Sequence, residues 1–201
     1  MHIIGITGGV GAGKTEVLSY IRTNYSSRIL LADEVGHLVK QKGQPGYKGL
    51  VELLGKEVLG ADGEIDKTKM ADLIFQNAEL LEQVNALLHP AVEQMIVSEM
   101  EKEKKLDRFA FFFVEAALLP DSGLKDMMEE IWYIHADEQV RRERLKASRG
   151  YPEEKIDRIM EAQRSEEAFK AASSVIIYNN ADFEDTKKQI DEKLGDYLWR
   201  S

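Results

Sequence analysis

A glycine-rich segment between an apolar run and an amphipathic one constrains this chain more than any other feature. Residues 8–15 read Gly-Gly-Val-Gly-Ala-Gly-Lys-Thr and match the pattern G-x-x-x-x-G-K-[ST]. Residues 2–7 before it are rich in isoleucine, as in a buried strand, and residues 16–21 after it place apolar side chains at helical spacing. The segment therefore has the strand–loop–helix context of a phosphate-binding loop. That context disfavours the alternative, a glycine-rich turn with an unrelated lysine.

The predicted loop carries the groups that hold the phosphates of a nucleotide. Its glycines let backbone N–H groups turn inward, and the start of the helix adds the positive end of its dipole. We expect Lys14 to reach the outer phosphates and the hydroxyl of Thr15 to hold Mg²⁺. The residues expected to bind the nucleotide are Gly8, Gly11, Ala12, Gly13, Lys14, Thr15 and Glu16. The sequence thus predicts a protein that binds a nucleoside triphosphate.

Composition limits the partners of such a site. The 201 residues carry 27 Lys and Arg against 36 Asp and Glu, a net charge of -9, which argues against a large nucleic-acid footprint. No cysteine is present, so disulfides and cysteine-based metal sites are excluded. No apolar run approaches ~20 residues, and the first one is too short for a signal peptide, so we expect a cytoplasmic protein without a membrane partner.

Short apolar runs alternate with helical patterns along the chain. The runs predicted to form strands are residues 2–7, 28–33, 109–114, 131–134 and 174–178, and residues 183–198 predict a closing helix. Strands that alternate with helices indicate an α/β fold with a five-stranded parallel sheet. Ligands of such a sheet bind at the carboxyl ends of its strands.

The stretch between the second and third predicted strands is helical throughout and far longer than a crossover requires. We therefore expect a kinase-type core over residues 1–33 and 108–201, with a helical insertion over residues 34–107. The alternative is that these helices pack on the sheet. Within the insertion, the dipeptide His89-Pro90 is typical of a helix boundary, so the patterns on either side of it predict separate helices.

Two acidic residues follow predicted strands and are candidates for chemistry. Asp33 ends the second strand, where its carboxylate could accept a proton from an attacking hydroxyl or hold Mg²⁺ through water. The alternative role is a cap for a helix beginning at Glu34. Glu115 ends the phenylalanine-rich strand and is a candidate metal ligand, although a capping or solvated glutamate fits that position about equally well.

A cluster of positive charge stands out in this acidic chain. Residues 141–149 carry five Lys or Arg side chains, and Arg142 and Arg149 share a helical face because they lie two turns apart. We expect lid helices over residues 138–172, with Arg142 and Arg149 stabilising charge on the transferred phosphoryl group. The alternative is a solvated helix face.

Several segments together resemble the dephospho-CoA kinase family. They are Ile6 to Thr15, Ala32-Asp33, Leu87 to Pro90, Ala117 to Leu119, Gln139 with the arginines after it, Gln163, and Ile176 to Asn180. The resemblance implies a three-layer P-loop kinase fold, a helical domain for the CoA part of the substrate and an arginine-bearing lid. It implies transfer of the γ-phosphoryl group of ATP to the 3′-hydroxyl of dephospho-CoA, with Asp33 as general base. His89 becomes a candidate substrate contact.

The chain departs from the family pattern at Leu31, at Pro120-Asp121 and at Ala181, which bears on secondary contacts to substrate and Mg²⁺. The sequence predicts an ATP-dependent kinase for a small molecule, a monomer or weak oligomer, with dephospho-CoA as acceptor. The alternatives are another nucleoside or metabolite kinase, or an ATP-binding regulatory homologue with weak or no turnover. A GTP switch is disfavoured because no Asn-Lys-x-Asp segment is present.

Overall fold

The computed structural model describes residues 1–75, 77–117 and 119–198, which form two compact units. The first unit combines Met1–Ile29 with Asp107–Ser201, and the second is Leu30–Leu106. The first boundary between the units lies between Ile29 and Leu30, whereas the sequence placed it after Asp33. Leu118 and the side chain of Pro120, both in segments compared with the family above, lie outside the description. Over the described ranges, no helix has the length and apolar character needed to cross a membrane.

A five-stranded sheet organises the fold. Its strands are β1 (His2–Thr7), β2 (Ser27–Leu31), β3 (Phe111–Glu115), β4 (Glu130–His135) and β5 (Val175–Tyr178). Their order is β2-β3-β1-β4-β5, and β1 pairs in parallel with both β3 and β4, as β4 does with β5. The predicted α/β fold with a five-stranded parallel sheet is therefore confirmed. β2 is shorter than expected, because the chain already turns into a helix at Ala32.

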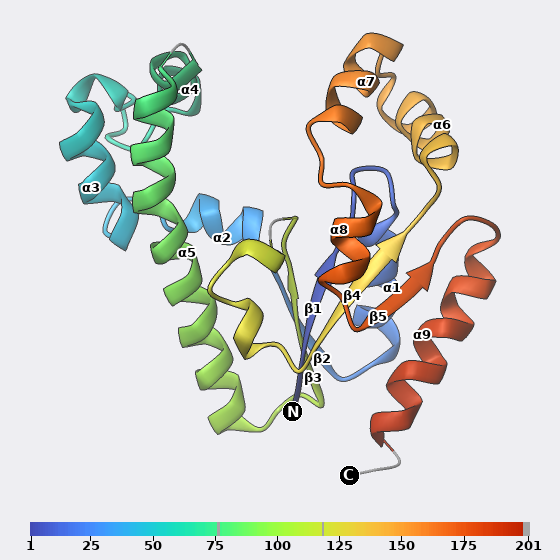
Figure 1. The fold of residues 1–201 in the computed structure, drawn as a ribbon. Coiled ribbons are helices and arrows are strands. Elements are labelled where there is room, and N and C mark those ends of the chain that lie inside the picture. Colours follow the sequence, from blue (N-terminus) through green and yellow to red (C-terminus); the bar gives the residue numbers. More distant parts are fainter. Residues whose placement is uncertain (76, 118, 199–201) are drawn as a thin grey trace. The chain divides into compact units, whose positions relative to one another are not determined.

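Helices cover both faces of this sheet because successive strand residues point to opposite sides. Tyr133 of β4 stacks on Phe169, with ring centres 5.0 Å apart, which places helix α8 (Glu166–Ala171) on one face. Trp132, which precedes Tyr133 in β4, contacts the ring of Phe113 edge to face on the opposite face of the sheet. That face carries α1 (Lys14–Asn24) and α9 (Phe183–Leu198), which are joined where Tyr20 and Tyr25 donate hydrogen bonds to one carboxylate of α9 (Figure 1).

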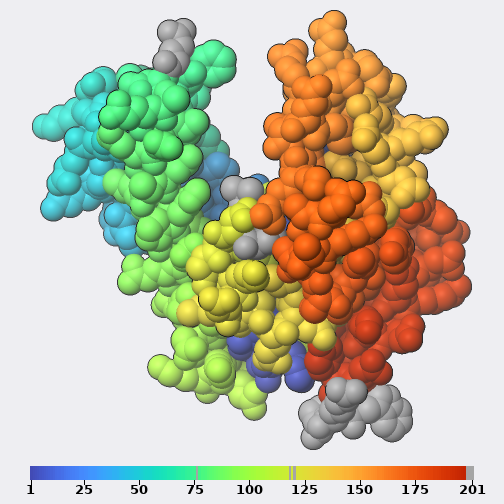
Figure 2. Space-filling view, in the orientation of Figure 1, coloured from blue at the N-terminus to red at the C-terminus, as the bar shows by residue number. Residues whose placement is uncertain are grey.

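Two further helices extend the first unit beyond the sheet. Helix α6 (Glu138–Arg149) follows β4 and ends where Gly150 adopts a left-handed conformation, and α7 (Glu153–Glu161) begins after Pro152. Both helices project past the carboxyl end of β4 (Figure 1), and their outer surfaces are open to solvent in the space-filling view (Figure 2). Short 3₁₀ turns, Leu119–Asp121 and Lys125–Met127, link β3 to β4.

The second unit is helical and has a core of its own. Its elements are α2 (Ala32–Leu38), α3 (Pro45–Leu54), a 3₁₀ turn at Lys56–Val58, α4 (Lys67–Phe75) and α5 (Ala78–Leu106). Buried side chains from α3, the 3₁₀ turn, α4 and α5 meet in one cluster, formed by Leu50, Leu54, Val58, Met70 and Val84. The periodic apolar residues of this stretch therefore pack against each other.

The helix boundary expected at His89-Pro90 is wrong. Pro90 lies inside α5, which runs as one helix through both segments that were expected to be separate (Figure 1). Proline within a helix removes one i to i−4 hydrogen bond, but here the turns on both sides are anchored by buried Val84 and Ile96. Tertiary packing thus overrides the local signal to stop.

We expect Pro90→Ala to stabilise the protein by about 1–3 kcal/mol, because it restores the missing hydrogen bond and removes the ring clash. Urea denaturation followed by circular dichroism measures the change. Glu82→Ala, at an exposed position of the same helix, is the control and should change stability by less than about 0.5 kcal/mol. A destabilised Pro90→Ala variant would show that the proline fits this helix better than alanine does.

Candidate nucleotide-binding site

The loop between β1 and α1 has a backbone that only glycines adopt easily. Gly8, Gly11 and Gly13 have φ angles of 148°, 83° and 90°, in the region that L side chains avoid. A side chain on Gly8 would also place its Cβ 2.5 Å from the carbonyl oxygen of Ile134. Gly13 caps α1 without a side-chain hydrogen bond, so the first turn presents N–H groups that have no acceptor within the helix. Such a helix start attracts phosphate.

Lys14 lies against the inside of this loop. Its ammonium donates hydrogen bonds to the carbonyl oxygens of Gly8, at 2.7 Å, and of Gly9, at 3.4 Å. It also lies 3.6 Å from a carboxylate oxygen of Glu115 at the end of β3. The structure therefore brings Lys14, Glu115 and the loop together. Thr15 and Glu16 are exposed in the first turn of α1.

Asn179, directly after β5, holds the loop by a hydrogen bond to its backbone. Its side-chain N–H donates to the carbonyl oxygen of Ala12 at 2.9 Å, and Ala12 itself is buried. The hydroxyl of Thr186 donates to the other end of the amide at 3.0 Å, which fixes its orientation. A Cβ on Gly13 would collide with the Asn179 amide, so this glycine is required by packing as well as by its φ angle.

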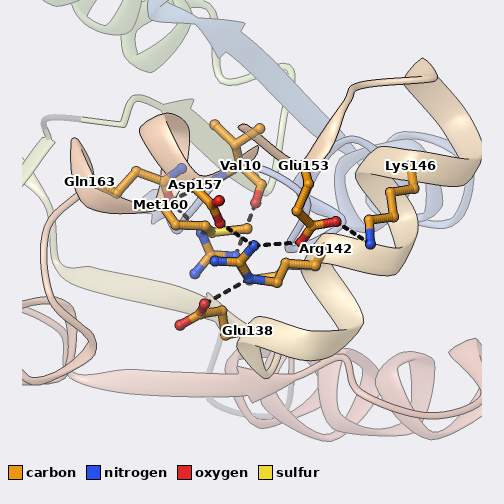
Figure 3. A network of polar contacts seen from close by, with 9 residues as sticks. Val10, Glu138, Arg142, Lys146, Glu153, Asp157, Met160 and Gln163 are labelled. Carbon is orange, nitrogen blue, oxygen red and sulfur yellow. Dashed lines mark hydrogen bonds and ion pairs between the residues drawn. The ribbon is translucent and has the colours of Figure 1, made fainter. Parts of the chain in front are cut away.

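The lid helices hold the outer side of the loop through Arg141 and Gln163. Arg141 Nε donates to the carbonyl oxygen of Val10 at 3.0 Å, and the Val10 N–H donates to Gln163 Oε1 at 3.1 Å. Arg141 Nη2 donates to the same Gln163 oxygen at 2.5 Å (Figure 3 shows Val10 and Gln163). Burial lowers the pKa of Arg141 from its ordinary value, which reflects how far this guanidinium is removed from water.

Arg142 is engaged within the lid. Its guanidinium contacts Glu138 at 2.8 Å, Glu153 at 3.0 Å and Asp157 at 2.6 Å, and Lys146 pairs with Glu153 as well (Figure 3). The hydrogen bonds that Arg142 donates to the carboxylates of Glu138 and Asp157 raise its pKa above the ordinary value. Arg142 thereby joins α6 to α7, and its expected contact with phosphate stays a prediction.

Arg149 is exposed at the last turn of α6 and lies over the ring of Tyr151, 5.9 Å from its centre. A hydrogen bond with Arg149 lowers the pKa of the Tyr151 phenol. The contact of Arg149 with phosphate, like that of Arg142, stays a prediction.

Asp33 and His89 belong to the second unit. Asp33 is exposed in the first turn of α2, whose N-cap is Leu31, so the capping alternative for Asp33 is wrong. His89 is exposed on α5, next to Pro90. The roles of Asp33 as base and of His89 as substrate contact stay predictions.

The oxygen donors beside the loop fit Mg²⁺. Thr15 offers a hydroxyl and Glu115 a carboxylate, both hard oxygen ligands of the kind that Mg²⁺ prefers. Over the described ranges, no cluster of three or more His, Asp or Glu side chains could hold a metal unaided.

Comparison with known proteins agrees with this geometry. The family model for dephospho-CoA kinase (CoaE) matches residues 2–185, nearly the whole chain. The chain belongs to the dephospho-CoA kinase family. A dephospho-CoA kinase of Streptococcus pyogenes is 34% identical over 196 residues, which cover 96% of each chain.

Solved structures resemble this chain over nearly its full length. TT1252 from Thermus thermophilus has a TM-score of 0.78 at 25% identity and covers 97% of both chains. Dephospho-CoA kinase from Campylobacter jejuni has a TM-score of 0.70 at 17% identity and covers 96% of this chain and 95% of its own. The family resemblance and the P-loop kinase fold expected from the sequence are confirmed.

Three residues that hold the loop had no role in the sequence-based site. Arg141 lies in the predicted cluster, but a run of adjacent arginines does not show which one turns inward. Gln163 and Asn179 were marked only by the family resemblance, because a lone amide carries no signal of its own. Their hydrogen bonds to Val10 and Ala12 depend on which helices and strands end beside the loop.

We expect Asn179→Asp to destabilise the protein by about 2–3 kcal/mol and to weaken nucleotide binding, because a buried carboxylate would face the Ala12 carbonyl oxygen in place of a donor. Urea denaturation and calorimetry with ATP measure the two effects. Asn24→Asp removes a similar amide-to-carbonyl hydrogen bond at an exposed position and is the control. Equal effects of both changes would contradict a special role for Asn179.

The pKa of Glu153 lies below its ordinary value of 4.5, chiefly because Lys146 donates a hydrogen bond to its carboxylate. A depressed pKa in the folded state means that the pairing contributes fully at neutral pH and is lost as the pH falls through that pKa. Titration of the Glu153 carboxyl by NMR should therefore give a midpoint below 4.5, and Lys146→Met should raise it. Lys188→Met on α9 is the charge-matched control, and an unchanged midpoint in Lys146→Met would rule the pairing out.

Proposed function

We propose that this chain transfers the γ-phosphoryl group of ATP to the 3′-hydroxyl of dephospho-CoA, which gives CoA and ADP. The observation that carries the proposal is the phosphate-binding loop, built with its glycine conformations and its lysine intact, in a chain that matches the dephospho-CoA kinase family over residues 2–185. The family match selects this acceptor among those that P-loop kinases phosphorylate.

The loop and the start of α1 bind the triphosphate. N–H groups of Gly11 to Thr15 donate to phosphate oxygens, and the helix dipole adds positive potential at the same point. Lys14, which donates to two carbonyl oxygens of its own loop in this structure, exchanges them for oxygens of the β- and γ-phosphates. A charged lysine gains more from an anionic oxygen than from a neutral carbonyl, so the exchange is favourable.

Asp33 accepts the proton of the ribose 3′-hydroxyl as the 3′-oxygen bonds to the γ-phosphorus. The bond from the γ-phosphorus to the bridging oxygen of the β-phosphate breaks at the same time, and ADP leaves. The support for this role is the place of Asp33, two residues after the end of β2, and the family resemblance of Ala32-Asp33. The helical unit of Leu30–Leu106 holds the acceptor, and His89 is its candidate contact.

Arg142 and Arg149 supply positive charge to the transferred group when the lid closes. Both have to leave partners, since Arg142 is bound by three carboxylates and Arg149 lies over Tyr151. Thr15 and Glu115 would hold Mg²⁺, which would supply positive charge beside the β- and γ-phosphates. For a loose transition state, placement and charge do most of the catalysis.

ADP release measured in a coupled assay tests the function. We expect release to depend on both ATP and dephospho-CoA, with 3′-phosphorylated product formed in equal amount. Faster phosphorylation of a nucleoside monophosphate than of dephospho-CoA would indicate a different kinase, and ATP binding without any acceptor-dependent ADP would indicate a protein without turnover.

Variants separate the roles of the loop and the base. Lys14→Ala should lower kcat/KM by about a thousandfold or more, because it removes charge from the transferred group. Asp33→Asn should lower kcat strongly and leave ATP affinity, measured by calorimetry, within about twofold of the wild type. Equal losses of rate and of ATP affinity in Asp33→Asn would show that Asp33 supports binding and is not the base.

A further inference from the structure

Both backbone groups of one loop residue, Val10, are bonded by lid side chains. Its carbonyl oxygen accepts from Arg141 Nε and its N–H donates to Gln163 Oε1. Arg141 and Gln163 also bond each other, through Nη2 and the same Oε1. The three groups form a closed ring of hydrogen bonds that links α6, the segment after α7 and the loop. We call this ring the Val10 latch.

Gly9 makes room for the latch. A Cβ at Gly9 would lie 2.5 Å from both Arg141 Nη2 and Gln163 Oε1, closer than real side chains approach. Gly9 does not share the positive φ angles of Gly8, Gly11 and Gly13. Its lack of a side chain is therefore explained by the latch and not by backbone conformation.

The latch uses only one end of the Gln163 amide. Oε1 accepts both hydrogen bonds, whereas the buried Nε2 has no hydrogen-bond partner among the described residues. What matters at position 163 is thus an acceptor within reach of two donors. Arg141 in turn needs two separate nitrogens, which a lysine does not offer.

We infer that Arg141 and Gln163 are positioning residues that hold the phosphate-binding loop in its ATP-receiving shape through Val10. By binding the N–H and C=O of Val10 from outside, they fix the residue that precedes Gly11, where the phosphate-facing N–H groups begin. A loop held in advance loses less freedom when ATP binds. Without the latch, ATP should bind more weakly, while the barrier from bound ATP to products should change little, so KM rises and kcat stays. This kinetic consequence rests on the proposed function.

Exchange of the Val10 amide hydrogen tests the latch without any assumption about activity. In the protein free of nucleotide, Gln163→Met keeps the side-chain length and removes the acceptor, so the Val10 N–H should exchange about tenfold faster by NMR. Gln163→Glu keeps an acceptor for both donors and should exchange within about twofold of the wild type. Rescue by glutamate separates the acceptor role from simple packing.

Kinetics then test what the latch does for the nucleotide. Gln163→Met should raise the KM for ATP about tenfold and change kcat less than about threefold. Arg141→Met should do the same, and the double variant should be no worse than either single one, since both changes open one ring. Arg158→Met removes an exposed lid arginine that bonds to the carbonyl oxygen of Glu154 in its own helix, and it is the charge-matched control.

The outcomes are distinct. Unchanged exchange at Val10 in Gln163→Met overturns the latch, whatever the enzyme phosphorylates. Faster exchange with an unchanged KM, or additive losses in the double variant, overturns the positioning role. If dephospho-CoA is not phosphorylated by the wild type, the proposed function fails, while the exchange result still decides whether the latch exists.

Discussion

The site depends on hydrogen bonds that side chains make to the backbone of the phosphate-binding loop. A loop with three glycines at positive φ has little intrinsic preference for one shape. Asn179 bonds the Ala12 carbonyl from the sheet side, and Arg141 with Gln163 bonds Val10 from the lid side. Between these supports, the start of α1 presents its N–H groups. These side-chain hydrogen bonds thus restrict the backbone conformations that the glycines would otherwise allow.

The lid carries more positive charge than the acidic chain around it, yet much of that charge is balanced locally. Arg142 and Lys146 are bound by carboxylates of α6 and α7, and Arg141 is held against the loop by its hydrogen bond to the Val10 carbonyl oxygen. Arg141 and Arg142 therefore have different roles. Arg141 shapes the loop, whereas Arg142 ties the two lid helices together and becomes available to a phosphate only if that phosphate displaces its carboxylates.

Sequence patterns predicted those parts of the fold whose cause is local. The apolar runs of β1, β3 and β4 and the periodicity of α9 are read directly, because burial on both faces or on one stripe leaves a periodic mark. The helix break at Pro90 was wrong, since the packing of α5 on both sides decides there. The glycine-rich motif of residues 8–15 located the phosphate-binding loop because its residues lie next to each other in the sequence. Its supports escaped prediction because a hydrogen bond between residues 10 and 163 leaves no mark in either segment.

The most direct measurement of the central claim is the affinity of the protein for adenosine, AMP, ADP and ATP by calorimetry with magnesium present. If loop N–H groups and Lys14 grip the phosphates, affinity should climb with each phosphate added, and ATP should bind about a hundredfold or more tighter than adenosine. Adenosine that binds as tightly as ATP would contradict the account, because the base and ribose alone would then provide the binding free energy.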